Sequence, residues 1–151
     1  MIHAKSREEG GIFMTGTYQH TLDAKGRLFI PSKLREELGD VFYVTISQEN
    51  CLHAYNEENW KRLCDKAAEM PYSAQGKLRP MFANASRCEL DAQGRILLSQ
   101  MLRSRAHLNR DVTIIGVNNH AEFWDKAEWD GINAEESTPE NIAAVMDSLG
   151  F

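Results

Sequence analysis

The sequence predicts an α+β protein built from two pseudo-symmetric repeats, each a β-hairpin followed by helices and further strands. One observation is a duplicated motif, because Asp-Ala-Lys-Gly-Arg at residues 23–27 returns 68 residues later as Asp-Ala-Gln-Gly-Arg at residues 91–95. A second observation is that the flanks repeat too: a leucine precedes each copy, and Leu-Arg, Asp-Val and a spaced aromatic pair follow each copy at similar distances. One unit of about 45 residues is therefore used twice.

The repeats account for most of the chain. The predicted divisions are a mobile N-terminal arm (residues 1–13), a first repeat (14–69), a partly helical linker (70–85), a second repeat (86–130) and an acidic C-terminal tail with a terminal helix (131–151). With 151 residues and 42% hydrophobic content, the chain can bury a core as one domain or as two halves that share one.

The first repeat opens with a predicted hairpin. Residues 17–22 alternate weakly and are rich in Thr and Tyr, which is typical of a strand. Asp23 and Gly26 occupy the first and fourth positions of a type I turn. Residues 27–30 form the return strand, so that Lys25 lies at the tip of the hairpin.

The remaining elements of the first repeat follow from start and stop signals. Pro31 favours a first helical turn and Gly39 can end the short helix after it. Residues 41–47 and 51–55 are β-branched and aromatic runs that predict two paired strands. Residues 57–69 carry an apolar stripe, and Asn56 before them is a suitable helix cap.

The linker and the second repeat are predicted in the same way. We expect residues 73–85 to be helical in part, with Pro80 kinking or interrupting the helix. Thr138-Pro139-Glu140 is a strong helix start, and the apolar stripe after it favours either a cover on the core of the chain or a subunit contact. The second repeat is predicted to contain strands at residues 96–98, 112–117 and 121–124 and helices at residues 101–108 and from 125 onward.

Composition indicates a soluble cytoplasmic protein with an uneven charge. No apolar run approaches the roughly 18 residues needed to cross a bilayer, and residues 1–14 lack a secretory h-region. The net charge is −5, but residues 118–151 hold eight acidic residues and one lysine, so residues 1–117 are at +2. Attraction to phosphate depends on the local charge of the face that meets it, so a basic face on an acidic protein can bind nucleic acid. The alternative is that these basic residues form an ordinary solvated surface.

Catalytic and metal-binding patterns are absent from the sequence. It contains no HExxH, no GxSxG and no CxxC, and Gly76-Lys77 is followed by Leu78 where a phosphate loop needs Ser or Thr. We therefore expect no enzyme activity, no cofactor, no metal and no small-molecule substrate. The histidines, which share no ligand spacing, and the cysteines, which we interpret as reduced core thiols, are His3, His20, His53, His107, His120, Cys51, Cys64 and Cys88.

The duplicated turn carries the functional question. In the structural interpretation, Asp23 caps its own turn and Arg27 screens its charge, and Asp91 and Arg95 do the same. In the functional interpretation, a rigid hairpin presents each guanidinium to a DNA groove, where arginine can pair bidentately with a guanine edge. The predicted DNA-binding residues are Asp23, Lys25, Arg27, Asp91, Gln93 and Arg95, with Lys33, Arg35, Arg87, Arg103 and Arg105 as candidate phosphate contacts.

Four segments resemble one family. Tyr-Gln-His-Thr-Leu-Asp-Ala-Lys-Gly-Arg at residues 18–27 and Ile-Pro-Ser-Lys-Leu-Arg-Glu-Glu-Leu at 30–38 are similar to MraZ, a family of bacterial transcriptional regulators, as are residues 91–95 and Phe-Trp-Asp-Lys at 123–126. The resemblance spans about residues 13–129. In one departure, Ser99 stands opposite Pro31, although a serine can start a helix as its cap.

The resemblance implies a fold and a function. It implies that the halves form an AbrB-like swapped-hairpin barrel and that the chains assemble into a homo-oligomeric ring. It also implies a nucleoid-associated regulator, in most cases a repressor, that binds short direct repeats of double-stranded DNA in the promoter of the division and cell-wall gene cluster, including its own. The alternative from another class is a protein-binding scaffold or an antitoxin-like module with the same fold, which the acidic tail favours.

Overall fold

A computed structural model describes residues 13–151, and all but the last residue of the N-terminal arm predicted over residues 1–13 lies outside the described part. The strands are β1 (Thr17–Thr21), β2 (Arg27–Phe29), β3 (Val41–Ile46), β4 (Cys51–Asn56), β5 (Ser86–Glu89), β6 (Arg95–Leu97), β7 (Asp111–Val117) and β8 (His120–Asp125). The helices are α2 (Ser32–Leu38), α3 (Glu57–Ala68), α4 (Tyr72–Ala83), α5 (Gln100–Arg105), α6 (Lys126–Glu136) and α7 (Pro139–Leu149). The mixed α+β class is confirmed.

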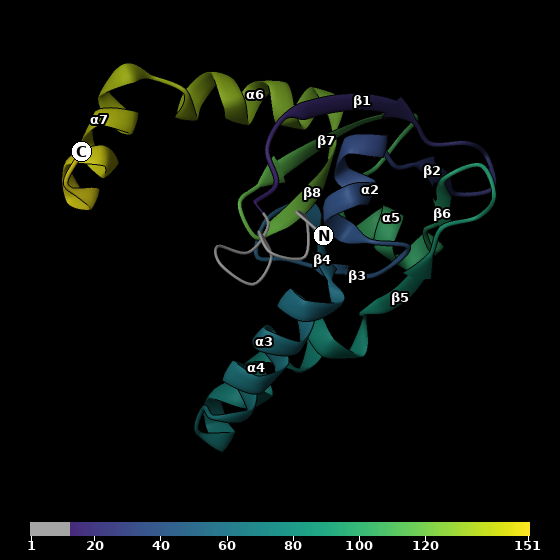
Figure 1. Ribbon diagram of the computed structural model, residues 1–151, viewed down its shortest axis with the longest axis horizontal. Coiled ribbons are helices and arrows are strands. Elements are labelled where there is room, and N and C mark those ends of the chain that lie inside the picture. The colour runs from purple at the N-terminus through teal and green to yellow at the C-terminus, as the bar shows by residue number, and fades with distance from the viewer. Residues whose placement is uncertain (1–12) are drawn as a thin grey trace, which may run out of the picture.

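The strands form a six-stranded antiparallel sheet in the order β1-β7-β8-β4-β3-β5 and a separate two-stranded antiparallel ribbon, β2-β6 (Figure 1). The order is symmetric about the β8-β4 pair, where the two halves meet. Each half contributes its first strand to the other, because β1 pairs with β7 and β5 pairs with β3. Within residues 13–151 the sheet is open, and its strands do not close into the barrel that the resemblance implies.

The predicted local hairpin is therefore wrong in its pairing. β1 and β2 are joined by a tight turn but share only an isolated bridge between Leu22 and Leu28. β1 instead runs along β7, with Thr17 opposite Ile115. The physical reason is that β7 offers β1 a continuous edge of five backbone pairs, whereas no side chain of β1 is fully buried, so its own alternation does not select a partner within its half.

One apolar core joins both halves. The main cluster takes buried side chains from β2, α2, β3 and β4 and from their counterparts β6, α5, β7 and β8. A half without its partner would expose these side chains to water, at about 25 cal/mol for each Å² of apolar surface. The largest fully buried members are Phe42, Phe123, Met14, Leu28, Ile30, Leu34, Leu38, Leu52, Ile96, Leu98 and Leu102.

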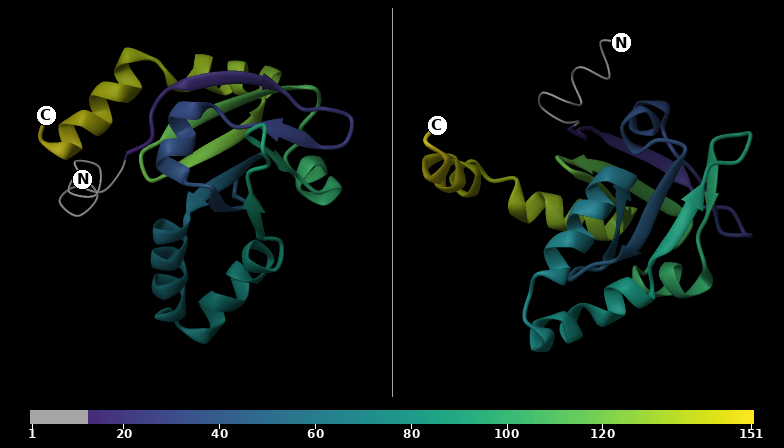
Figure 2. Two further views of the ribbon diagram at one scale, coloured as in Figure 1. Left: turned by 45° about the vertical axis from the view of Figure 1, so that its right-hand side comes forward. Right: turned by 60° about the horizontal axis from the view of Figure 1, so that its bottom comes forward.

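Helices α3 and α4 lie side by side and project from the sheet (Figure 2). The side chain of Asn56 caps α3 by accepting a hydrogen bond from the backbone N–H of Asn59, as predicted. The linker is helical as expected, but Pro80 does not interrupt it, because α4 runs through this residue to Ala83. The helix continues although proline supplies no backbone donor, so α4 lacks one of its hydrogen bonds at this point.

The C-terminal helices behave differently from each other. Helix α6 packs on β7 and β8 through Trp129 and Ile132, which cover a small second cluster on the sheet. Helix α7 begins at Thr138 as predicted, but its side chains are exposed along its whole length. The interpretation of this helix as a cover on the core of its own chain is therefore wrong (Figure 1). Among the helices of residues 13–151, none has the length and apolar character needed to cross a membrane.

Candidate nucleic-acid interface

The first turn, residues 23–27, is organised by one carboxylate. The backbone N–H of Gly26 donates to the carbonyl oxygen of Asp23 at 3.0 Å and closes the turn. Oδ1 of Asp23 accepts from the backbone N–H groups of Lys25 (3.0 Å) and Arg27 (2.8 Å). Oδ2 of Asp23 accepts from Nε of Arg27 at 2.7 Å. Because this ion pair uses Nε, the outer Nη edge of the guanidinium points away from Asp23.

The second turn, residues 91–95, repeats this network. Oδ1 of Asp91 accepts from the backbone N–H groups of Gln93 and Arg95, each at 2.9 Å, and Oδ2 accepts from Nε of Arg95 at 2.9 Å. One contact has no counterpart in the first turn, since Nη2 of Arg95 donates to Oε1 of Gln93. The side chain of Arg95 is 27% exposed and that of Arg27 is 35% exposed. The second arginine is therefore held more firmly.

Both aspartates stay ionised at neutral pH. Hydrogen bonds from the backbone N–H of Arg27 and from its guanidinium hold the pKa of Asp23 below its ordinary value, although partial burial acts against them. The backbone N–H of Arg95 has the same effect on the pKa of Asp91. Each carboxylate thus shapes its turn and orients its arginine. These contacts are the ones that the structural interpretation of the duplicated turn predicts.

The ribbon brings the two arginines onto one face. In the β2-β6 register Arg27 lies opposite Leu97 and Arg95 lies opposite Phe29, so these four side chains share the outer face. Leu28 and Ile96, the central pair, point the other way and are buried in the core. Diagonal neighbours on such a face are about 7–8 Å apart, which is the separation expected for the Cα atoms of Arg27 and Arg95.

Each turn is also supported by the opposite half. The N–H of Leu98 donates to the carbonyl oxygen of Gly26 at 2.8 Å, and the N–H of Ile30 donates to that of Gly94 at 2.9 Å. A guanidinium lies against each glycine: that of Arg103 in α5 against Gly26, and that of Arg35 in α2 against Gly94. Both glycines have positive φ angles and carry no side chain that would separate them from these partners.

The other predicted basic residues divide into two groups. Lys25 at the tip of the first turn and Lys33 on α2 are exposed.

The four remaining residues are arginines whose guanidinium groups already contact other parts of the chain. Arg35 and Arg103 are half-buried supports of the turns, and Nε of Arg103 donates to the carbonyl oxygen of Leu98. The exposed Arg87 pairs with Glu89, and Arg105 donates to the carbonyl oxygen of Ser47.

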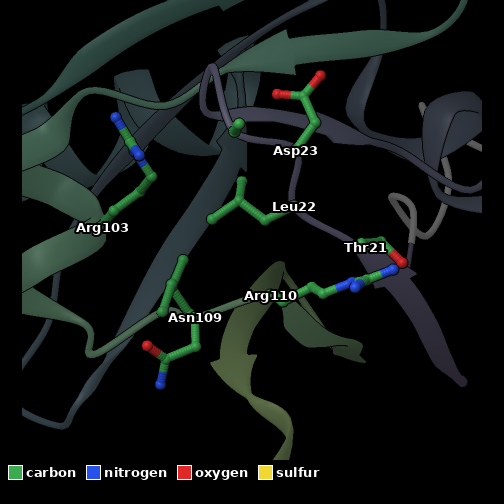
Figure 3. A pocket seen from close by; sticks show the side chains of 8 residues that line it. Thr21, Leu22, Asp23, Arg103, Asn109 and Arg110 are labelled. Atoms are coloured by element: carbon green, nitrogen blue, oxygen red, sulfur yellow. The ribbon is translucent and has the colours of Figure 1, made fainter.

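A hollow of about 580 Å³ opens beside the first turn. Figure 3 shows Arg103 and Arg110 on opposite sides of Leu22, with Asp23 at the rim. A hollow of about 730 Å³ lies at the second turn, where Arg35 and Asp91 contribute to its lining. The pseudo-symmetry of the fold therefore extends to the grooves around the turns.

Three residues of this region were not predicted from the sequence. Phe29 and Leu97 share the outer face with the arginines, and Arg110 lines the first hollow. The alternation Arg27-Leu28-Phe29 is a signal for the first of them, because residues two apart on a strand face the same way. Arg110 carries no such signal, since it reaches the first turn only through the long-range pairing of β1 with β7.

Cys51 and His53 lie two residues apart on β4, and the fold brings Glu122 of β8 to them. Cys51, His53 and Glu122 are all buried, and one potential ligand atom from each lies within 4.8 Å of the others. The register of β4 with β8 places His53 opposite Glu122, and no spacing along the chain reports that contact. The three cysteines are free thiols, but only Cys51 and Cys88 are buried; Cys64 is half-buried on α3, so its interpretation as a core thiol is wrong.

The family comparison fits the doubled turn. A family model described as "MraZ protein, putative antitoxin-like" matches residues 13–78 and again residues 81–148. The chain belongs to the MraZ family. A transcriptional regulator MraZ from Acetivibrio thermocellus is 45% identical over 140 residues, which cover 90% of this chain and 98% of the relative. Those from Caldicellulosiruptor saccharolyticus and Alkaliphilus metalliredigens are 43% and 42% identical, covering 91% and 90% of this chain and 99% and 98% of their own lengths. MraZ is thus a family of transcriptional regulators, which is not an enzymatic role.

Proposed function

We propose that the chain is a sequence-specific DNA-binding transcriptional regulator that inserts the outer face of the β2-β6 ribbon into the major groove. The observation that carries the proposal is the placement of Arg27 and Arg95 at diagonal positions on that face. The major groove admits a two-stranded ribbon, and it presents the O6 and N7 atoms of guanine to arginine. A separation of about 7–8 Å between the arginines corresponds to about two base-pair steps of 3.4 Å.

The aspartates would prepare the arginines for this contact. Each carboxylate holds Nε, so the Nη edge is oriented before DNA arrives and less side-chain entropy is lost on binding. Arg95 is already bonded through Nη2 to Gln93, whereas the tip residue of the first turn is Lys25, which carries a charge. We therefore expect Arg27 to make the stronger contact and Lys25 to add a phosphate or base contact.

The distribution of charge supports the same face. Helix α7 and the C-terminus lie on the far side of the molecule from β2 and β6 (Figures 1 and 2). The acidic residues of the tail are thus kept away from the ribbon. Exposed Lys25 and Lys33 are the best placed phosphate contacts, while Arg87 and Arg105 would have to leave their present partners. With so few cationic contacts per chain, binding should be weak for a single copy and strongly dependent on salt.

Assembly would supply the missing affinity. The exchange of first strands between the halves supports an AbrB-like, swapped arrangement, from which a homo-oligomeric ring would be built. A ring meeting several direct repeats converts later contacts into intramolecular ones, which raises avidity if the spacing of the repeats fits. The proposed targets are direct repeats in the promoter of the division and cell-wall gene cluster, including that of the chain itself, with repression as the usual outcome. Such binding would associate the protein with the nucleoid.

The proposal is tested by binding the full chain to a DNA fragment from just upstream of its own coding sequence. Arg27→Ala and Arg95→Ala should each weaken binding by about 5- to 150-fold, which corresponds to about 1–3 kcal/mol for one bidentate contact. The matched control is Arg62→Ala, which removes an exposed arginine from α3, away from the ribbon. Footprinting should show protected direct repeats, and light scattering should show an oligomer at micromolar concentration.

The test separates sequence-specific contacts to bases from sequence-independent contacts to phosphate. Equal affinities of Arg27→Ala, Arg95→Ala and Arg62→Ala for the repeats would refute the assignment of the ribbon. A loss of affinity that is the same on unrelated DNA would show that the arginines contact phosphate only. A stable monomer in light scattering would contradict the ring.

A second candidate function rests on the exposed helix α7. The side chains of its apolar stripe, which are 40–64% exposed, are Ile142, Val145, Met146 and Leu149. Such a stripe suits a protein partner or another copy of the chain, as in a scaffold or an antitoxin-like module. Deleting residues 138–151 should leave DNA binding by the ribbon intact if the stripe serves a separate protein partner, and should weaken it if the stripe joins subunits.

A further inference from the structure

The β4-β8 pair carries a buried group of side chains with metal-binding atoms. His53 and Glu122 are directly opposite in the register, and Cys51 lies two residues before His53 on the same face. Cys51 is 0% exposed, and His53 and Glu122 are each 8% exposed. A sulfur, an imidazole nitrogen and a carboxylate oxygen lie within 4.8 Å of one another. β4 belongs to the first half and β8 to the second, so the group bridges the two halves at the centre of the sheet (Figure 1).

One buried atom in this group lacks a hydrogen-bond partner. Nε2 of His53 is buried and lies 3.3 Å from Oε2 of Glu122, without the geometry of a hydrogen bond. A buried polar atom without a partner is costly, and an imidazole nitrogen facing a carboxylate oxygen is favourable when a cation lies between them. This cation can be a proton on the imidazole ring or a metal ion. Cys51 lies beside His53 and Glu122, and a cysteine sulfur is a typical ligand of a metal ion.

Neighbouring side chains hold these residues in place. Ligating histidines and carboxylates usually have such partners, which fix the ring and the carboxylate in the orientation that binds metal. The hydroxyl of Tyr55 lies 3.1 Å from Nδ1 of His53, and the hydroxyl of Ser47 lies 3.4 Å from Sγ of Cys51. Glu122 has two such partners. Nε1 of Trp124 donates to Oε1 of Glu122 at 2.9 Å, and Nε2 of His120 lies 2.8 Å from Oε2 of Glu122.

We propose that Cys51, His53 and Glu122 bind a divalent transition-metal ion of the zinc class, which joins the two halves of the chain. Zinc takes sulfur, nitrogen and oxygen ligands at about 2.0–2.3 Å in a tetrahedron, so its ligand atoms are about 3.3–3.7 Å apart. The group needs to contract by about 1 Å from its present span, which side-chain rotation supplies. Three protein ligands leave a fourth position for water or for Nε2 of His120. Thiolate and imidazole donors favour zinc or cobalt over magnesium or calcium.

Binding has a defined proton balance. Burial raises the pKa of Cys51 to about 12, so without a metal the group carries a neutral thiol. On binding, the sulfur–hydrogen bond breaks, the sulfur bonds to the metal and the proton leaves to water. Burial of Glu122 opposes its ionisation, but the hydrogen bond from His120, the imidazole of His53 beside the carboxylate and the hydrogen bond from Trp124 outweigh burial and hold its pKa well below the ordinary range, so the carboxylate binds without releasing a proton. Metal binding therefore releases the proton of the Cys51 thiol to water.

The experiment uses the purified full chain, stripped with a chelator and titrated with Co²⁺ and Zn²⁺. We expect one Co²⁺ per chain, with the strong visible bands of tetrahedral cobalt and a thiolate-to-cobalt band in the near ultraviolet that Zn²⁺ displaces. Cys51→Ser should abolish the near-ultraviolet band, and His53→Gln and Glu122→Gln should weaken binding by more than about 100-fold, beyond the 10- to 100-fold expected for Tyr55→Phe. Zn²⁺ should also raise the melting temperature of the wild type.

Cys88→Ser is the matched control, because Cys88 is also buried but lies in the main core on β5, away from this group. Its cobalt spectrum should equal that of the wild type. No near-ultraviolet band in the wild type at micromolar Co²⁺, or a band that survives Cys51→Ser and disappears in Cys88→Ser, overturns the proposal. If circular dichroism shows that Cys51→Ser does not fold, the cobalt affinities of Glu122→Gln and His53→Gln test the proposal instead. Affinities equal to that of the wild type in both variants also overturn the proposal.

Discussion

Replacing Gly26 with alanine should destabilise the protein far more than the equivalent change at Gly94. Gly26 has φ +86° and Gly94 has φ +78°, so alanine at either position costs about 1–2 kcal/mol in backbone conformation. The surroundings differ. A Cβ at Gly26 would lie 2.7 Å from the carbonyl oxygen of Leu98, a backbone atom of the opposite half. A Cβ at Gly94 would meet Nη1 of Arg35, the far end of a flexible side chain that can move aside.

The magnitudes follow from these contacts. Moving the backbone at Leu98 strains the cross-half hydrogen bond to Gly26 and adds about 1–3 kcal/mol, as other overpacking substitutions do. Gly26→Ala should therefore lower the free energy of unfolding by about 2–5 kcal/mol and Gly94→Ala by about 1–2 kcal/mol, with the loss in Gly26→Ala the larger by about 1–3 kcal/mol. Gly131→Ala is the control, because no atom lies within 4 Å of its Cβ position in α6. Alanine there should stabilise the protein by up to about 1 kcal/mol through helix propensity.

Urea denaturation followed by circular dichroism measures all three variants. Since a domain of this size has about 5–15 kcal/mol of stability, the loss in Gly26→Ala is large enough to resolve. A value for Gly26→Ala within about 0.5 kcal/mol of that for Gly94→Ala would refute the argument that backbone contact between the halves sets the cost. A loss of stability in Gly131→Ala as large as either would refute the comparison itself.

Two further outcomes are expected. Asp23 should titrate below its ordinary pKa of 3.8 in a carbon-detected NMR titration, and it should remain below that value in Arg27→Ala because the backbone N–H groups that lower the pKa are retained. Its contribution to stability is then present above the unfolded-state pKa and is lost as the pH falls through the folded-state pKa; titration at or above 3.8 in the wild type would contradict this. Pro80→Ala should raise the free energy of unfolding by about 1–3 kcal/mol in urea denaturation, because proline inside α4 removes a backbone donor, and a loss of stability would contradict this explanation.

Local signals predicted the elements well. Gly39 ends α2, Asn56 caps α3 and Thr138 caps α7, each where the sequence places it, whereas Pro31 precedes α2 as its N-cap instead of lying inside the first turn. Ser99 also caps α5 by accepting a hydrogen bond from the backbone N–H of Leu102, as expected for the residue that stands opposite Pro31. These features depend on a few neighbouring residues, so the sequence contains all the information that they need.

Long-range pairing could not be predicted. Thr17 in β1 lies opposite Ile115 in β7, a residue of the other half of the chain, and alternation alone does not identify a partner strand. The group of Cys51, His53 and Glu122 was missed for the same reason, since it forms only when β4 and β8 are in register. Contacts of this kind depend on how the two repeats pack against each other, which the residues beside each strand do not report.

The exchange of first strands gives the proposed DNA-binding ribbon a direction. In a dimer of identical chains the two turns would be the same, and both ends of the ribbon would present the same side chains to DNA. Here both turns belong to one chain, so each can change independently, and they differ at Lys25 against Gln93 and at Pro31 against Ser99. A ribbon with unequal ends suits a site that also has a polarity, such as repeats arranged head to tail rather than as a palindrome.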